Sequence, residues 1–414
     1  MSQASVQLTA VESRIREALA SRGDAMITDL ARHVAIPTGG GHDAGLDEYR
    51  GLLLDRLRAV GAEIEFSDGD PKPVWLDFGP HPDDAPPSRT PPRTAIATLP
   101  GGSGPRILIA CHLDTVFDPN GSFQRMTISG DGATAVGPGV VDMKGGVLIT
   151  LNAIEALAEA GVASRVTLAL TSDEETGSYA SNRTLRELAR QADIGIATEP
   201  ALPGGELVIE RFGSGQFRIE TRGRSAHVGR AFTEGISAVT ALAEAIVRIS
   251  EMPDADRGRI LNIGPLLGGA VSNAVPDMAR AWGNVRFPTN EIADEIRAML
   301  TELETPTDAM PALHIDCSFN RPAKPKTEAV ERFARLARVC AESLGQRMPF
   351  ATTGGVCDGN ILQDEGVPTI DTLGVRGGGL HTADEWIDLS SLVERSQLMA
   401  LLLHRLSQGA LTTP

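Results

Sequence analysis

The chain has 414 residues, of which 42% are hydrophobic but only 4% are aromatic, and its formal net charge is −16. This length is more than one simple core needs and predicts two domains, filled mainly by aliphatic side chains. The negative charge excludes a nucleic-acid partner held by phosphate attraction, which needs an excess of Lys and Arg. It also does not suit binding to an anionic membrane surface.

The cysteines are single and far apart, at Cys111, Cys317, Cys340 and Cys357. This spacing excludes zinc-knuckle and thioredoxin-like CxxC motifs, and four cysteines are too few for a disulfide scaffold. The N-terminus lacks the basic start and apolar run of a signal peptide. Because no apolar run reaches the roughly eighteen residues of a membrane span, we expect a cytoplasmic protein with no membrane partner.

The first half of the chain alternates between helical and extended patterns. Apolar residues at steps of four predict helical structure from about 8 to 36, where Pro37 and a glycine run end it. The next predicted elements, in chain order, are helix 45–60, strand 62–66, a polar loop over 68–93, strand 107–116, helix 143–160, strand 166–171, helix 179–190 and strand 194–197. This alternation predicts a mainly parallel sheet covered by helices.

The pattern changes near residue 207. The segment LVIERFGSGQFRIETRG alternates with period two, as half-buried antiparallel strands do. The elements predicted after it are helix 234–251, strands 260–266 and 279–287, helix 291–304 and strand 312–318. Their order predicts a compact α+β unit of ferredoxin-like type.

An α/β pattern returns after about residue 322. Its predicted elements are helix 326–344, an apolar strand within 367–375 and helix 390–408. We therefore expect one α/β domain formed by 1–207 and 321–414, interrupted by an α+β domain at 208–320.

Acids and histidines follow the predicted strands at the points where these strands end. They are His112 and Asp114 after ILIAC, Asp142 after GPGVV, Glu174 and Glu175 after VTLALTSD, Glu199 after IGIAT, and His381 after a glycine run. Residues two apart at a strand end point the same way, and ligands of open α/β sheets gather at the carboxyl ends of the strands. An interrupted α/β domain would bring these side chains together.

Two histidines and several carboxylates, without cysteine, suit divalent ions such as Zn²⁺, Co²⁺ or Mn²⁺. One carboxylate bridging two ions makes a two-metal hydrolytic site, and such cations would let the adjacent acids of TSDEETGS stay ionised. Taken singly, a strand-end acid is more often a helix cap or a solvated side chain. The conjunction of HxD, GxGxxDxKGG, DEExG, ATEP and a late GGxxH, in this order, is much more specific.

With these motifs the chain resembles the M20 metallopeptidase family from about residue 20 to 410, and most closely its glutamate carboxypeptidase (carboxypeptidase G2-like) branch. Acetylornithine deacetylase and succinyl-diaminopimelate desuccinylase are related. The resemblance implies a zinc-peptidase α/β domain with an inserted lid and dimerisation domain. It implies that His112 and Glu199 hold one metal ion, that Glu175 and His381 hold the other, and that Asp142 bridges the two.

The resemblance also implies roles outside the ligand set. Asp114 would orient His112, and Glu174 would be the general base, taking a proton from the attacking water and handing it to the leaving amine. The histidine that reaches into the partner subunit's site would be His227. For substrate binding, the matching residues are Asn273, Arg321 as a clamp on the substrate's carboxylate, and Gly355.

Some features weaken single assignments. By itself, His227 is as well explained as a surface-loop histidine. Asn284 stands where the family often has an Asp two residues before the Arg, which leaves the role of Arg286 open. Nothing pairs Cys111 or Cys357 with a positioned base, so both are expected to be small buried side chains.

The expected activity is two-metal hydrolysis of an amide bond next to a free carboxylate, in an N-acyl amino acid or a C-terminal peptide bond. We expect two divalent ions per chain, with Zn²⁺ foremost and Co²⁺ or Mn²⁺ as alternatives, in a homodimer joined through the lid domain. An N-deacetylase or desuccinylase of a small metabolite would use the same machinery. A non-catalytic binding protein on this scaffold would not need Glu174 together with all five ligands.

Overall fold

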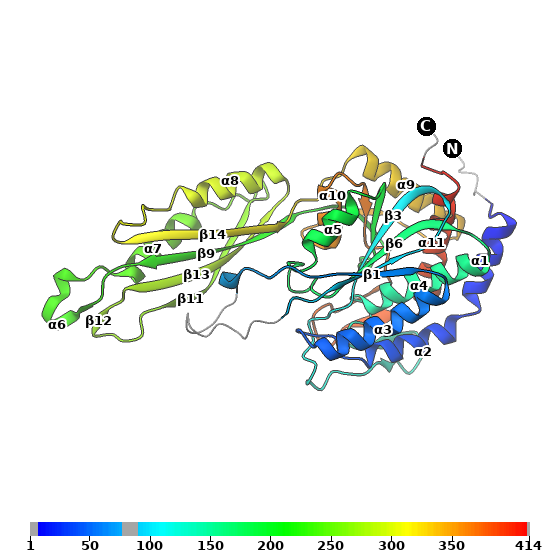
Figure 1. Cartoon of the computed structure of the whole chain (residues 1–414), viewed down its shortest axis with the longest axis horizontal. Helices are drawn as coiled ribbons and strands as arrows, with labels where there is room; N and C mark the ends of the chain where they lie inside the picture. Colours follow the sequence, from blue (N-terminus) through cyan, green and yellow to red (C-terminus); the bar gives the residue numbers. More distant parts are fainter. Residues whose placement is uncertain (1–6, 77–89, 412–414) are drawn as a thin grey trace.

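The computed structural model describes residues 7–76 and 90–411. It is elongated, with a larger α/β domain at one end and a smaller inserted domain at the other (Figure 1). Within the described residues, no helix combines the length and the apolar character that crossing a membrane requires.

Six strands form the central sheet of the α/β domain in the order β1-β2-β6-β3-β7-β16. They are β1 (Glu63–Ser67), β2 (Thr94–Thr98), β3 (Ser103–His112), β6 (Ser164–Thr171), β7 (Ile194–Ala197) and β16 (Thr369–Ile370). The four strands from β6 to β16 are parallel, whereas β1 and β2 pair antiparallel at one edge. The parallel pattern expected from the sequence is therefore confirmed for the strands that carry the acids.

Helices cover both faces of this sheet. They are α1 (Ala10–Ala20), α2 (Gly23–Val34), α3 (Asp43–Ala59), α4 (Lys144–Glu159), α9 (Glu328–Ser343) and α11 (Ser390–Ser407) in one core, and α5 (Asn182–Ala189) and α10 (Asp358–Asp364) in the other. Side chains alternate along a strand, so Ile107 and Ile109 of β3 face the first core while Leu108 and Ala110 face the second.

The helical stretch expected over 8–36 is two helices, since α1 ends at Ala20 and α2 begins at Gly23. Leu19 and Met26 are both fully buried in the same core. These two residues are seven apart, which is two helical turns, so the apolar period continues across the break. Hydrophobic periodicity alone therefore did not reveal the break between the two helices.

The inserted domain has an antiparallel sheet in the order β11-β13-β9-β14. Its elements are β9 (Gly213–Arg222), α7 (Ala238–Ser250), β11 (Ile260–Gly268), β13 (Met278–Phe287), α8 (Asn290–Thr301) and β14 (Ala312–Arg321). Both helices share a separate hydrophobic core with the sheet. The end far from the α/β domain carries β10 (Ala226–His227), α6 (Val228–Ala231), η2 (Phe232–Glu234) and β12 (Ala274–Val275) (Figure 1).

The first part of the period-two segment behaves differently from the expectation of antiparallel strands. β8 (Leu207–Arg211) pairs in parallel with β15 (Phe350–Thr353) and packs in the core of the α/β domain. Its three consecutive apolar residues are all buried, as in a strand covered on both faces. The chain enters the inserted domain after β8 and returns after β14, where Arg211 and Lys324 pair. The domain boundaries expected at 208 and 320 remain predictions.

A small sheet, in the order β17-β18-β5-β4, lies beside the loop of His381. Its strands are β4 (Thr127–Ile128), β5 (Thr134–Val136), β17 (Gly377–Gly378) and β18 (Trp386–Asp388). Of the polar segment 68–93, residues 77–89 lie outside the described residues. Before them, η1 (Val74–Leu76) reaches the inserted domain, where Trp282 Nε1 donates to the main-chain oxygen of Trp75 at 2.7 Å.

His33 makes stability depend on pH. Its imidazole is buried against Tyr49, and burial, with the positive charges of Arg56 and Lys144, lowers its pKa to about 3. The unfolded imidazole titrates near pH 6.5, so between pH 6.5 and about 3 only the unfolded state takes up this proton. The free energy of unfolding therefore falls as pH falls, by up to about 1.4 kcal/mol per pH unit from this group. Urea titrations across this range should show a shallower dependence for His33→Gln; equal slopes would contradict the assignment.

Candidate metal centre and active site

The strand-end residues form two groups of three that share Asp142. One group is His112, Asp142 and Glu199, and the other is Asp142, Glu175 and His381. Within each group, one potential ligand atom from each residue lies within 4.8 Å of the others. The structure thus brings the five expected ligands together, in the division that the resemblance implied.

The topology of the sheet explains this convergence. β6, β3 and β7 are parallel neighbours, so their carboxyl ends lie at one edge. His112 is the last residue of β3, while Glu175 and Glu199 follow β6 and β7 within a few residues. Asp142 comes just before α4, and His381 comes from the loop between β17 and β18.

Asp142 lies between the two histidines. Its Oδ1 is 3.2 Å from His112 Nε2, and its Oδ2 is 3.4 Å from His381 Nε2. His381 Nε2 is also 3.3 Å from Glu175 Oε2. Each oxygen of Asp142 therefore faces one ligand group, as a bridging carboxylate requires. His112 and Glu199 are buried, whereas His381 is exposed, so one group is enclosed and the other opens to solvent.

The electrostatics of the cluster suit cations. Burial raises the pKa of Glu175 to about 7 and that of Glu199 well above its usual value. Hydrogen bonds to Asp142 and Glu175 raise the pKa of His381 to about 10. In the absence of cations, these pKa shifts favour the protonated forms of Glu175, Glu199 and His381. Metal ligands bind in their deprotonated forms, so two divalent ions would replace those protons, and the donor set of imidazole and carboxylate fits Zn²⁺, Co²⁺ or Mn²⁺.

Asp114 fastens the turn that carries the acids. Its carboxylate accepts the main-chain N–H groups of Glu174 and Glu175, at 3.3 and 2.9 Å. His112 Nδ1 is 3.0 Å from the main-chain oxygen of Asp114 and 3.6 Å from its carboxylate. The ring of His112 is thus oriented mainly by the Asp114 carbonyl, while the carboxylate fixes the acid turn.

Glu385 is a supporting residue that sequence reasoning missed. It is fully buried and accepts the main-chain N–H groups of Gly139, Val141 and Asp142 at 2.9 to 3.2 Å. These bonds fix the backbone that presents the bridging carboxylate. The polar stretch HTADEW around Glu385 looks like a solvated loop, so only its position four residues after His381 could have signalled this role.

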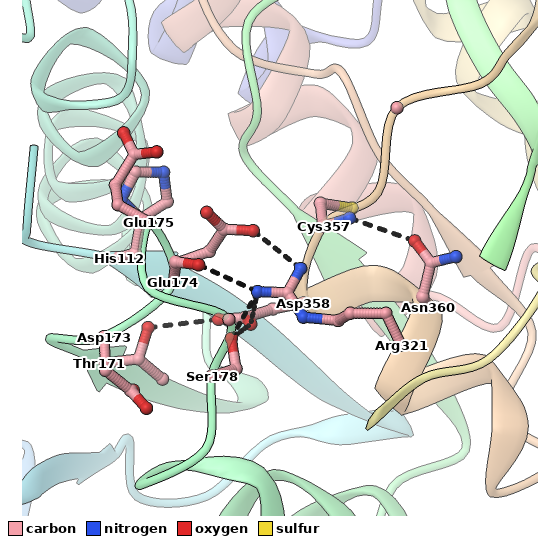
Figure 2. A network of polar contacts seen from close by, with 12 residues as sticks. His112, Thr171, Asp173, Glu174, Glu175, Ser178, Arg321, Cys357, Asp358 and Asn360 are labelled. Atoms are coloured by element: carbon pink, nitrogen blue, oxygen red, sulfur yellow. Dashed lines mark hydrogen bonds and ion pairs between the residues drawn. The ribbon is translucent and has the colours of Figure 1, made fainter. Parts of the chain in front are cut away.

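The three adjacent acids of TSDEETGS, which follow β6, have different surroundings. Asp173 is buried and accepts the main-chain N–H groups of Ala180 and Ser181, which closes the loop that leads into α5. Glu175 belongs to a ligand group, whereas Glu174 points to Arg321 (Figure 2). Glu174 belongs to neither ligand group, so its carboxylate is left for a different task.

Other expected site residues lie apart from the cluster. His227 in β10 and Asn273, which precedes β12, are exposed at the far end of the inserted domain (Figure 1). They are close to each other, because Val228 N–H donates to the main-chain oxygen of Asn273 at 3.1 Å. Gly355 is exposed in the loop after β15, and its carbonyl accepts Arg211 Nη1 at 3.1 Å. The structure therefore does not bring His227 and Asn273 to the cluster of their own chain.

Arg286 and Arg321 flank β9 at the same register, because both pair with Ser214. Arg286 Nη1 is buried without a hydrogen-bond partner among the described residues. Burial lowers the pKa of Arg286, and the neighbouring charge of Arg321 adds to this effect.

The two cysteines nearest the cluster are inert by environment. Cys111 and Cys357 are buried as expected. Burial raises the pKa of the Cys111 thiol to about 11 and that of Cys357 well above its usual value. Since the thiolate is the nucleophile, these thiols do not support Cys-His chemistry.

Comparisons with known sequences point in the same direction as this geometry. A sequence model of "Peptidase family M20/M25/M40" matches residues 108–405. Carboxypeptidase G2 of Pseudomonas sp. (strain RS-16) is 27% identical over 391 residues, which cover 93% of this chain and 90% of that protein. Succinyl-diaminopimelate desuccinylase of Methylobacterium radiotolerans is 27% identical over 368 residues, which cover 83% of this chain and 89% of that protein.

Two solved structures share the fold. Aminopeptidase PepT from Bacillus cereus has a TM-score of 0.69 at 24% identity and covers 93% of this chain and 98% of its own. The YXEP protein of Bacillus subtilis, described as a dinuclear metal binding peptidase, has a TM-score of 0.63 at 17% identity, with 95% and 99% covered. At these identities the likeness concerns the fold alone, and it covers both the α/β domain and the inserted domain.

Proposed function

This chain belongs to peptidase family M20/M25/M40, and from that premise we propose that it hydrolyses an amide bond next to a free carboxylate. The substrate would be an N-acyl amino acid or the C-terminal peptide bond of a short peptide. The observation that carries the proposal is the pair of ligand groups sharing Asp142, with Glu174 beside them and outside both. The similarity to carboxypeptidase G2 along most of the chain supports this substrate class.

The two ligand groups, Glu174 and Asp114 have different roles in the proposed reaction. Two divalent ions, held by the two ligand groups, would polarise the scissile carbonyl and make a water molecule more acidic. Glu174 takes a proton from the water molecule while the water oxygen bonds to the carbonyl carbon. Glu174 then gives this proton to the amide nitrogen as the C–N bond breaks. Asp114 keeps Glu174 and Glu175 in register by holding their main-chain N–H groups.

We propose a homodimer in which the inserted domain, expected over 208–320, serves as lid and dimerisation domain. His227 and Asn273 lie at its far end, so they would contribute to the site of a second subunit. Exposed apolar side chains on α7 and β11 support an interface on the inserted domain. They are Val239, Val247, Ile260 and Leu266. β11 is also an edge strand of the sheet, and an exposed apolar edge favours pairing with another chain.

The similarity to succinyl-diaminopimelate desuccinylase keeps a second candidate function open. A desuccinylase or deacetylase would use the same ligands and the same Glu174, and would differ in the pocket for the acyl group. A panel of N-acetyl, N-succinyl and N-benzoyl amino acids, together with dipeptides ending in Glu, Asp or a neutral residue, separates the candidates. The preferred acyl group and C-terminal residue identify the activity.

Metal removal tests the proposed function. We expect close to two divalent ions per chain by inductively coupled plasma mass spectrometry, because two ligand groups are present. Chelation should abolish hydrolysis and lower the melting temperature, since ions that bind only the folded state stabilise it. Zn²⁺, Co²⁺ or Mn²⁺ should restore both. Full activity in protein shown to be free of metal would sink the proposal.

A further inference from the structure

Arg321 connects the inserted domain to Glu174. It is the last residue of β14, and its side chain is almost completely buried, at 3% exposure. Its Nη1 donates to Glu174 Oε1 at 2.7 Å, and its Nη2 donates to the main-chain oxygen of Glu174 at 2.9 Å (Figure 2). One guanidinium therefore holds both the carboxylate and the backbone of Glu174.

The side chains of Ser178 and Asp358 also contact the guanidinium of Arg321. Nη2 also donates to Ser178 Oγ at 2.6 Å, and Ser178 Oγ donates to Asp358 Oδ1. Asp358 is the first residue of α10; its Oδ1 is 3.7 Å from Arg321 Nη2, and its Oδ2 accepts Thr171 Oγ1 at 3.1 Å. Asp358 and Ser178 are both buried. Figure 2 shows the continuous chain of polar contacts from α10 through Arg321 to Glu174.

The end of β14 also fastens the loop in which Glu174 lies. Asn320 Nδ2 donates to the main-chain oxygen of Gly177, and Asn182 Nδ2 donates to the main-chain oxygen of Asn320 at 3.3 Å. Together with the bond from Arg321 to the Glu174 carbonyl, these contacts attach the loop and the first residue of α5 to the end of β14. The position of Glu174 thus depends on the strand that leads out of the inserted domain.

We propose that Arg321 is a positioning residue for Glu174, held in place by Ser178 and Asp358, and not the clamp on the substrate's carboxylate. The inference rests on the proposed function, because it needs Glu174 as general base. Binding a carboxylate in two places needs two parallel N–H groups of one guanidinium. Each parallel pair of N–H groups on a guanidinium includes Nη2, and Nη2 of Arg321 already donates to both the Glu174 carbonyl and Ser178 Oγ. Although Nε is buried without a partner, a two-point clamp would therefore have to give up a bond that holds the backbone of Glu174 or Ser178.

The first test measures substrate binding in an inactive background. The probe is the N-acyl amino acid that the wild-type enzyme hydrolyses fastest in the panel; if it hydrolyses none, the proposed function fails before this inference is tested. Titration calorimetry compares Glu174→Gln with the double variant Glu174→Gln/Arg321→Met. Neither variant has a base for Arg321 to position, so the Kd values of the two variants should agree within about threefold. This is well below the factor of ten that 1.4 kcal/mol represents. A clamp would lose charge-assisted hydrogen bonds, so a Kd raised about tenfold or more overturns the inference.

The second test separates kcat from KM in the presence of Glu174. We expect Arg321→Met to lower kcat about 100-fold, the cost of a misplaced catalytic group, with KM changed less than about threefold. Asp358→Asn should lower kcat in the same way but less. Arg218→Met removes the same charge from the same sheet, where Arg218 pairs with Asp316, and should leave kcat unchanged.

An Arg321→Met variant whose loss of activity is a raised KM would also overturn the proposal, because it would indicate weaker substrate binding. So would a kcat within a factor of two of wild type, because Glu174 would then act without the guanidinium. Metal content and melting temperature are measured for each variant. If Arg321→Met does not fold, the same comparison of kcat and KM in Asp358→Asn decides, because Asn keeps the shape of the side chain.

Discussion

Replacing Glu174 by Gln is expected to lower kcat by a factor of about 10² to 10⁴ while both metal ions stay bound. The range is that of a lost general acid–base catalyst. Gln has nearly the shape of Glu and can still accept a hydrogen bond from Arg321, but it cannot take a proton from water. Because Glu174 lies outside both ligand groups, the substitution leaves the metal ligands untouched. Steady-state kinetics and metal analysis of the same preparation measure the two effects.

Glu175→Gln is the matched control, since it makes the same chemical change one residue further along the chain. Glu175 lies in the ligand group with Asp142 and His381. We therefore expect this variant to lose metal from that group together with activity. A Glu174→Gln protein with near-normal kcat would remove Glu174 from the role of base. Loss of metal from Glu174→Gln would show instead that Glu174 is a ligand.

The convergence of the candidate metal ligands could be predicted from the sequence because simple geometry governs it. Parallel strands put their carboxyl ends at one edge, so an acid or histidine that ends a buried strand has one available location. His112, Glu175 and Glu199 follow β3, β6 and β7 in this way. His381 required more than strand order, because its loop is placed by the small sheet of β17 and β18.

The supporting residues could not be predicted, for a physical reason. Asp358 reaches Ser178 and Arg321 from positions far apart in the sequence, through bonds that exist only after the sheet and α10 have packed. Hydrophobic periodicity reports which face of an element is buried, but not which polar partner a buried side chain meets. The roles of Glu385 and Asp173 are of this kind, since each accepts main-chain N–H groups that fix the site.

The end of Arg321's strand shows a second limit of sequence reasoning. The resemblance implied a clamp for the substrate's carboxylate, which is an assignment by motif. The structure places the guanidinium against Glu174 and Ser178, and the proposed positioning role rests on these contacts. A motif identifies a residue type and a position in the chain, while the direction of a long side chain depends on the charges around it, here the carboxylates of Glu174 and Asp358.

Mixed dimers are expected to regain activity that neither parent has. Glu174→Ala lacks the base, and His227→Ala lacks the histidine proposed to reach the partner's site, so each homodimer should be inactive. After subunit exchange, a mixed dimer has one site with Glu174 from one chain and His227 from the other. With random pairing of equal amounts, half of the dimers are mixed and half of their sites are complete, so about a quarter of the wild-type activity should return.

The expectation follows from the place of His227 in the fold. β10 and α6 lie at the end of the inserted domain far from the α/β domain (Figure 1), and His227 is exposed there beside Asn273. His227 is in neither ligand group of its own chain. In the proposed dimer it would act on the site of a second subunit, which makes complementation between chains a direct consequence of that proposal.

The double variant Glu174→Ala/His227→Ala, mixed with His227→Ala, is the control, because no pairing of these chains gives a complete site. Exchange is verified independently by co-purification of differently tagged subunits. Demonstrated exchange without recovered activity would refute the role of His227 across the interface. It would leave the proposed metal ligands and Glu174 unaffected, because those residues all come from one chain.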